Sequence, residues 1–236
     1  DVYKRQKPYH MKRTLLFFTA AILMISGASC QSKDNTTNQQ RALKAQQTIT
    51  PTQVAPIDGL DRAYFASGCF WCVEAVYESL KGVKESISGY SGGHTQNPTY
   101  ASSNTGRTGH AEAVEIIYNA QEIRFSDLVD VYFGSQNIEQ VNGQGPDRGS
   151  QYRSIIFYQN QAQKDIIDAK IKKIEQTLGK GKVAAEVLPF EKFWEGESYH
   201  QNYEKLHPSN PYIQNVSIPR LMKFQKKFPD LLKTKA

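Results

Sequence analysis

The sequence predicts an α+β domain with a mixed sheet of the split βαβ (ferredoxin-like) type, helices packed on that sheet, and a long irregular C-terminal segment. The first observation is the order of its periodic segments, β-α-β-β-α-β followed by an extra helix and strand. The second is size, because residues 59–236 suit one domain with a sizeable hydrophobic core.

The first half of this order begins with a strand at residues 62–67. A turn at Gly68 then opens an amphipathic helix that ends at Gly82. A second strand is predicted at 84–93, where the segment ends in a glycine turn, and a third at 110–119.

The second half contains two more helices, two more strands and a C-terminal helix. They are predicted as a helix at 126–135, a strand at 152–160, a helix at 161–181, a strand at 182–189 and a helix at 219–228. We expect Ser126 to cap the first of these helices, because a Ser side chain accepts hydrogen bonds from free helical N–H groups. The aromatic, Pro-rich stretch before the last helix is expected to be irregular.

The N-terminus has the features of an exported precursor. We expect translation to start at Met11, where a basic pair precedes an apolar run at residues 15–25 that is short for a membrane span. Residues 1–30 are therefore expected to hold upstream residues and a signal peptide, and not to belong to the folded domain.

The apolar run ends in SGASC, which resembles the lipobox of bacterial lipoproteins and makes Cys30 a candidate lipidation site. Gly27 stands where a larger aliphatic residue is more usual, so simple cleavage is the alternative. Residues 31–58 are polar and are predicted to be a disordered tether reaching about 30 Å. We expect an exported protein of the bacterial cell envelope, either periplasmic or anchored to the outer membrane by lipid.

The basic net charge comes mostly from residues 1–30. The chain has a net charge of +6, and +2 remains without residues 1–30, which carry five basic residues and one acid. Nucleic-acid binding requires a strong and clustered basic excess, so we expect no nucleic-acid partner. The domain is expected to act as a monomer.

Two of the three cysteines, Cys69 and Cys72, flank an aromatic pair in the stretch SGCFWC. Residues at i and i+3 of a helix lie on one face, so these thiols can come together. Cys69 is expected at the helix N-terminus, where free N–H groups and the helix dipole lower a thiol pKa. A purely structural disulfide would close a very short loop and give little stabilisation.

The cysteine pair leaves open zinc ligation, thioredoxin-like disulfide exchange, or a reductase whose nucleophile has its own resolving thiol. Zinc requires about four ligands, and no third cysteine lies within residues 59–236. Two or more histidines would have to converge on the pair, from among His94, His110, His200 and His207. We expect no metal and no cofactor.

The motifs GCFWC, GYSGG, NPTY, TGHAEAVEIIY, GPDRGSQYRS and YHQNY occur in this order over residues 62–212. Their order and spacing resemble the A-type peptide methionine sulfoxide reductases (MsrA). The resemblance implies reduction of the S epimer of methionine sulfoxide in oxidised proteins. It assigns the nucleophile to Cys69, the attending glutamate to Glu112, the methyl-binding side chains to Phe70 and Trp71, and substrate contacts to Tyr100, Tyr152 and Asp147.

The strand pattern supports Glu112 independently of the resemblance. Period-2 alternation puts Glu112 on the same face as Val114 and Ile116. Glu115 faces the opposite side. Burial would raise the pKa of the Glu112 carboxyl toward neutrality, and the resulting acid can protonate a sulfoxide oxygen. Asp147 follows a Gly-Pro pair, so it can equally serve to shape a turn.

The expected cycle forms a sulfenic acid on Cys69, which Cys72 converts to a disulfide. Cys72 is expected to be the resolving thiol, because no cysteine follows it where many family members carry one. An external thioredoxin-like dithiol, able to reach an exported domain, would reduce the disulfide. Gln136 and Asn137 replace the His-Asp-Pro pattern common in the family. The rivals are a thioredoxin-like exchanger, which leaves the buried glutamate unexplained, and a non-catalytic surface lipoprotein.

Overall fold

The computed structural model describes residues 49–234, which belong to the compact unit Lys44–Ala236. The predicted signal peptide, Cys30 and most of the predicted tether lie outside the described residues. No helix within residues 49–234 is both long and apolar enough to cross a membrane.

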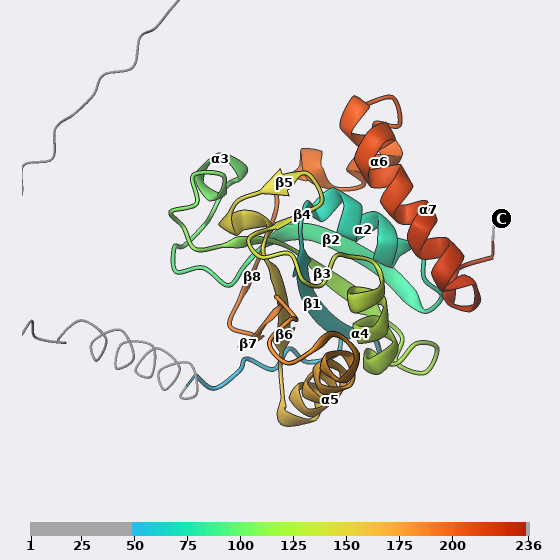
Figure 1. Cartoon of the computed structure of the whole chain (residues 1–236). Coiled ribbons are helices and arrows are strands. Elements are labelled where there is room, and N and C mark those ends of the chain that lie inside the picture. Colours follow the sequence, from blue (N-terminus) through green and yellow to red (C-terminus); the bar gives the residue numbers. More distant parts are fainter. Residues whose placement is uncertain (1–48, 235–236) are drawn as a thin grey trace, which may run out of the picture. The chain divides into compact units, whose positions relative to one another are not determined.

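The elements follow one another along the chain with the labels of Figure 1. The strands are β1 (Asp61–Ser67), β2 (Val83–Ser91), β3 (Ala111–Tyr118), β4 (Gly143–Gln144), β5 (Asp147–Arg148), β6 (Ser154–Tyr158), β7 (Glu186–Pro189) and β8 (Phe193–Glu195). The α-helices are α2 (Phe70–Glu78), α3 (Tyr100–Ser103), α4 (Phe125–Gly134), α5 (Gln161–Leu178), α6 (Tyr203–Leu206) and α7 (Ile218–Lys227). Short helical turns are η1 (Ser150–Tyr152), η2 (Ser198–His200), η3 (Ile213–Ser217) and η4 (Pro229–Leu231).

Six strands form the main sheet in the order β7-β6-β1-β3-β2-β8. The central pair β1 and β3 is antiparallel, with Phe65 opposite Val114, and β6 and β2 pair antiparallel on either side. Helix α2 thus connects β1 to β2 with β3 between them, and the chain through α4 connects β3 to β6 with β1 between them. The predicted split βαβ sheet with packed helices is confirmed.

The two edge strands extend this core sheet. Strand β7 runs parallel to β6 after the crossover through α5, and β8 pairs antiparallel with β2. Strand β8 lies within the segment predicted to be irregular, so that part of the prediction is wrong. Strand β8 packs closely on β2 at Gly89. A Cβ at this position would lie 2.3 Å from the carbonyl oxygen of Trp194, so only glycine fits there.

The sheet buries apolar side chains on both faces. Strand β1 alternates between them, with Phe65 directed to the main core and Tyr64 to a smaller cluster in which it stacks on Phe190 at 3.7 Å between ring centroids. Helix α2 packs on β2 and β3 and is covered in turn by α7 (Figure 1). Helix α2 is therefore held between the sheet and the C-terminal helix.

Several predicted boundaries shift for local reasons. Helix α4 begins at Phe125 with Arg124 as its N-cap residue, and the backbone N–H of Arg124 donates to Oδ2 of Asp127 at 3.0 Å, so the predicted cap at Ser126 is wrong. Helix α5 ends at Leu178, because Gly179 adopts a positive φ of 99°. Of the strand predicted at 182–189, only β7 pairs.

Candidate active site

The turn between β1 and α2 places Cys69 at the N-terminus of the helix. Gly68 has a φ of +84°, and a Cβ there would lie 2.5 Å from the Cβ of Gln144, so both conformation and space require glycine. Cys69 is the N-cap residue and makes no capping hydrogen bond with its side chain. Cys69 is 6% exposed, so its thiol is largely shielded from bulk solvent.

A cavity of about 250 Å³ surrounds this thiol, and we call it the Cys69 pocket. Apart from Cys72, it brings together every site residue predicted in the catalytic domain. Its lining is Cys69, Phe70, Trp71, Tyr100, Glu112, Asp147, Tyr152, Asn210 and Tyr212. Residues far apart in the sequence thus converge on one small volume.

Two aromatic side chains of α2 form the apolar part of the Cys69 pocket. The Trp71 indole stacks on Tyr203 with 3.8 Å between ring centroids and donates from Nε1 to Nδ1 of His200 at 3.2 Å. The Phe70 ring packs against His200 and Tyr100. These contacts fix the orientation of both rings. His200 and Tyr203 were not predicted as site residues, although the motif YHQNY contains them.

Glu112 is the buried acid of the pocket. It is 2% exposed on β3, and its Oε2 accepts a hydrogen bond from the backbone N–H of Phe70 at 3.0 Å. Burial raises the pKa of Glu112 to about 8; the Phe70 N–H opposes this shift, and the negative charge of Asp147 adds to it. The predicted burial is confirmed, and the carboxyl is mostly protonated at pH 7.

Glu115, three residues along the same strand, has the opposite surroundings. Its Oε1 accepts from the Tyr64 hydroxyl at 2.7 Å and pairs with Arg62 at 3.2 Å. The two carboxyls lie on different faces of β3, as the alternation predicted. Only Glu112 reaches the Cys69 pocket.

Two phenol groups supply donors beside Glu112. Tyr100 begins the short helix α3, where its backbone N–H donates to Oε1 of Glu197 at 2.9 Å, and Tyr152 ends the turn η1. Burial raises the pKa of both hydroxyls above the ordinary value for tyrosine, and the nearby Glu112 raises it further. Both hydroxyls therefore stay protonated at neutral pH and can donate to an oxygen in the pocket.

Asp147 and Tyr212 form one wall of the Cys69 pocket. Asp147 begins β5 after the tight β4–β5 turn, and its Oδ2 accepts from the Tyr212 hydroxyl at 2.7 Å. The same hydroxyl lies 3.7 Å from Sγ of Cys72. Burial raises the pKa of Asp147, against the effect of the Tyr212 hydrogen bond. Tyr212 was not predicted as a site residue.

The two thiols differ in acidity, with Cys72 more acidic than Cys69. Burial raises the pKa of Cys69 well above that of a free thiol, and its hydrogen bond with Cys72 raises it further, so the predicted lowering by the helix N-terminus is wrong. The same hydrogen bond lowers the pKa of Cys72 to about 7, with help from the positive charge of Arg220. In the resting pair, Cys69 holds its proton and Cys72 is the acidic thiol.

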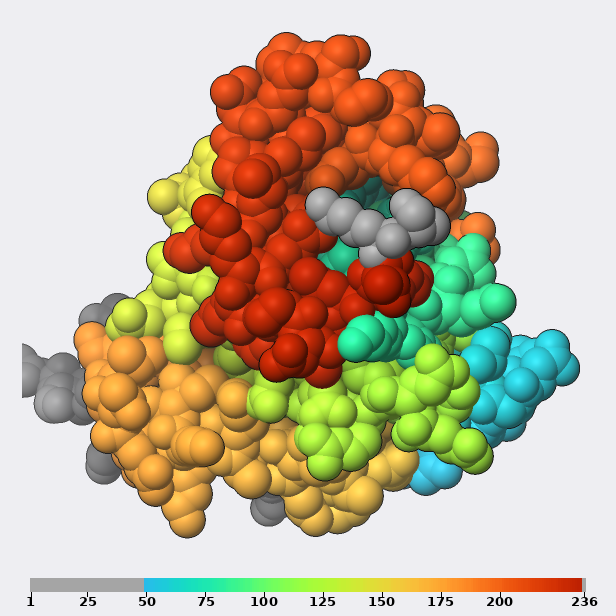
Figure 2. All heavy atoms as spheres, turned by 90° about the vertical axis from the view of Figure 1, so that its right-hand side faces the viewer, coloured from blue at the N-terminus to red at the C-terminus, as the bar shows by residue number. Residues whose placement is uncertain are grey.

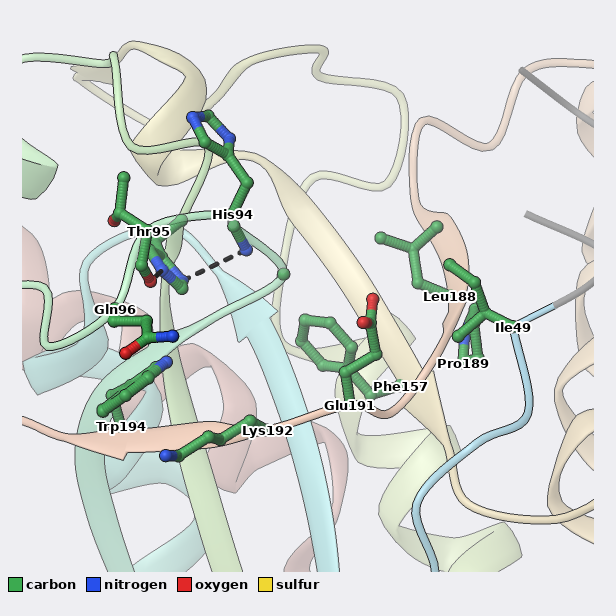
Figure 3. A pocket seen from close by; sticks show the side chains of 13 residues that line it. Ile49, His94, Thr95, Gln96, Phe157, Leu188, Pro189, Glu191, Lys192 and Trp194 are labelled. Atoms are coloured by element: carbon green, nitrogen blue, oxygen red, sulfur yellow. Dashed lines mark hydrogen bonds between the residues drawn. The ribbon is translucent and has the colours of Figure 1, made fainter. Parts of the chain in front are cut away.

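A second cavity on another part of the sheet, of about 380 Å³, lacks this chemistry. Figure 3 shows His94, Thr95, Gln96 and Trp194 on one side of it and Ile49, Leu188 and Pro189 on the other. No cysteine lines it, and His110 is already occupied, accepting from the Gly93 N–H and contacting the carbonyl of Thr95. The reactive groups are concentrated at the N-terminus of α2.

The sequence model of the family described as peptide methionine sulfoxide reductase matches residues 61–232. The chain belongs to this family. The MsrA of Saccharolobus solfataricus is 44% identical over 174 residues, covering 74% of this chain and 98% of the relative. The MsrA of Pasteurella multocida is 43% identical, covering 73% of this chain and 98% of the relative.

The fold is also similar to solved structures of reductases. Methionine sulfoxide reductase A of Corynebacterium diphtheriae has a TM-score of 0.58 at 30% identity, covering 64% of this chain and 77% of that one. Reduced Mxr1 of Saccharomyces cerevisiae has a TM-score of 0.59 at 30% identity, covering 70% and 93%. As a peptide methionine sulfoxide reductase, the protein is a thiol-dependent oxidoreductase that acts on the S epimer of the sulfoxide. Membership favours this activity over general disulfide exchange.

Gln136 and Asn137, where the sequence departs from the family pattern, belong to an amide network outside the Cys69 pocket. Gln144 accepts from the Asn137 N–H at 2.7 Å and donates to Oε1 of Gln136 at 3.0 Å. Ser154 also donates to Oε1 of Gln136, at 2.8 Å. The network holds strand β4 against the start of β6, and thereby positions the turn that carries Asp147.

Proposed function

We propose that Cys69 reduces methionine sulfoxide with Glu112 as the proton donor, and that Cys72 resolves the oxidised Cys69. The observation that supports this most directly is the Cys69 pocket, where a thiol, a buried protonated carboxyl and an aromatic wall enclose one small volume. A methyl group fits against Phe70 and Trp71, while the polar sulfoxide oxygen meets the donors of Glu112, Tyr100 and Tyr152. The pocket therefore suits a small side chain with one apolar and one polar end.

In the first step, sulfur of Cys69 attacks the sulfoxide sulfur and Glu112 delivers a proton to its oxygen. The proton of the Cys69 thiol passes to Cys72, which accepts its hydrogen bond and has the lower pKa. The bond between the oxygen and the methionine sulfur then breaks, the OH group passes to the sulfur of Cys69 to form a sulfenic acid, and methionine leaves as the thioether. Protonation matters because an oxide ion is a poor leaving group, and a buried acid is well placed to donate.

In the second step, sulfur of Cys72 attacks the sulfenic sulfur, the S–O bond breaks and water leaves. The two sulfurs are then joined as a disulfide, and Cys69 has lost its oxygen. Cys69 immediately precedes α2 and Cys72 lies in its first turn, a spacing that allows a bridge without large backbone movement. A thioredoxin-like dithiol then reduces this disulfide, which restores both thiols and leaves the reductant itself as a disulfide.

The assignment is tested by supplying a small dithiol and peptides that carry either the S or the R epimer of methionine sulfoxide. We expect one equivalent of methionine per dithiol oxidised with the S epimer and no consumption with the R epimer. Dithiol consumption that is independent of sulfoxide would instead identify a disulfide exchanger.

The proposed cellular place is the bacterial envelope, reached through a signal peptide with lipidation at Cys30. It is supported by the basic pair, the apolar run and the SGASC sequence of residues 11–30. We propose that the domain works as a monomer, because residues of one chain complete the Cys69 pocket. Expressing the full chain in a bacterium with labelled palmitate tests the anchor: Cys30→Ala should remove the label, and an unlabelled wild type would contradict lipidation.

A further inference from the structure

A third cavity, larger than the Cys69 pocket, touches the same cysteine pair from the side of Cys72, and we call it the Cys72 groove. It has a volume of about 930 Å³ and is lined by Cys72, residues 134–139 and 144–147, Leu178 and the face of the C-terminal segment from Tyr212 to Lys227. Asp147 and Tyr212 belong to both cavities. Their hydrogen bond therefore divides the space around the two thiols, with Cys69 on one side and Cys72 on the other.

The Cys72 groove has the build of a protein-docking surface. Its apolar part comes from Ile138, Leu178, Val216, Pro219 and Phe224. In Figure 2 the red α7 lies across this face of the molecule and borders the yellow-green residues that precede β4. A small side chain such as methionine sulfoxide cannot fill this volume, whereas a loop of another protein can.

Positive charge lies along one wall of the groove. Arg220, Lys223 and Lys227 follow one another at spacings of three and four residues on α7, which puts them on one face of the helix. The Arg220 guanidinium is fixed, donating to Ser67 and to the carbonyl of Ser135. Lys223 and Lys227 are exposed, while the acidic lining consists of Glu139 and the hydrogen-bonded Asp147.

We propose that the Cys72 groove is the docking surface for the reductant, a thioredoxin-like domain that brings a dithiol within an apolar rim carrying acidic side chains. This inference rests on the proposed function. A thiolate attacks a disulfide in line with the sulfur that leaves, so approach from this groove directs attack at Cys72 and expels Cys69 toward its own pocket. Approach from the other side would require the reductant to enter a pocket of about 250 Å³.

The chemistry of the exchange balances in two steps. The reductant thiolate bonds to Cys72, the Cys69–Cys72 bond breaks, and Cys69 leaves with the electron pair and takes a proton from Glu112 beside it. The second thiol of the reductant then bonds to its own partner sulfur and releases Cys72. The reductant departs as a disulfide, and the low pKa of Cys72 favours that release.

The experiment compares two electron donors for one set of variants. We expect Lys223→Glu with Lys227→Glu to lower kcat/KM for a thioredoxin, regenerated by its reductase, by about tenfold and to weaken its dependence on salt. Turnover with dithiothreitol and the single-turnover rate with sulfoxide should stay at wild-type values. Lys192→Glu, in the cavity of Figure 3, is the matched control and should leave both donors unaffected.

Three other results would contradict the docking surface or the reductase mechanism. Equal kcat/KM for thioredoxin in the double variant and the wild type would overturn the docking surface. Loss with dithiothreitol as well would also overturn it, since a small dithiol needs no docked protein. A wild-type protein inactive with dithiothreitol would instead contradict the proposed reductase mechanism itself.

Discussion

The Cys69 pocket and the Cys72 groove lie on either side of the hydrogen bond between Tyr212 and Asp147. The pocket is small, its aromatic rings are fixed by stacking, and its acid is kept neutral by burial. The groove is more than three times as large, with an apolar floor and cations on one wall. In the proposed cycle, one short CxxC segment serves two partners of different size, because its two sulfurs face different spaces.

Removing the nucleophile gives the largest expected effect. Cys69→Ser should abolish sulfoxide reduction, because no thiol remains in the pocket to attack sulfur. Methionine release from a sulfoxide peptide, measured by chromatography, checks this. The matched variant Cys72→Ser should still release about one methionine per protein, because the nucleophile Cys69 remains, although more slowly because the thiol that accepts the Cys69 proton is lost. Measurable turnover by Cys69→Ser would contradict the assignment of Cys69 as nucleophile.

Removing the carboxylic acid of Glu112 gives the second largest expected effect. Glu112→Gln keeps the size of the side chain and loses its transferable proton, so the single-turnover rate should fall by about 10²- to 10⁴-fold. Stopped-flow tryptophan fluorescence of the reduced enzyme measures it. Glu115→Gln changes the carboxyl on the other face of β3 and should leave that rate unaltered. A Glu112→Gln rate close to wild type would reject Glu112 as proton donor.

The pH profile sharpens the role of the same group. The pKa of Glu112 is raised to about 8, so the protonated form prevails below that pH and is lost above it. The single-turnover rate of the wild type should therefore decrease as pH rises through about 8. In Glu112→Gln this basic limb should vanish, leaving a low rate; an unchanged limb would assign it to another group.

The smallest effect is expected at the hydrogen bond between Tyr212 and Asp147, which separates the Cys69 pocket from the Cys72 groove. Tyr212→Phe removes the hydrogen bond to Asp147, and a typical bond of about 0.5–1.5 kcal/mol corresponds to a two- to tenfold change in a rate that depends on it. We expect slower disulfide formation after the sulfenic acid appears, measured by rapid quenching and alkylation. Tyr158→Phe on β6 is the control. Normal disulfide formation would show that the wall is dispensable.

Periodicity alone was enough to predict the β-α-β-β-α-β core, and alternation separated Glu112 from Glu115. Strand β8 could not be found this way, since three residues carry no period and its pairing with β2 bridges about a hundred residues of chain. Tyr212 reaches the pocket only through the path of the C-terminal segment. The acidity order of Cys69 and Cys72 depends on burial and on Arg220, which the local sequence of α2 does not contain.

The most direct test of the divided cysteine pair is mass analysis of the reduced wild type and of Cys72→Ser after one equivalent of a peptide carrying methionine S-sulfoxide. We expect a Cys69–Cys72 disulfide in the wild type and a trappable sulfenic acid on Cys69 in the variant, each with about one methionine formed. A wild type in which Cys69 is linked to Cys30 or to no cysteine, or a variant that turns over fully with thioredoxin, would contradict it.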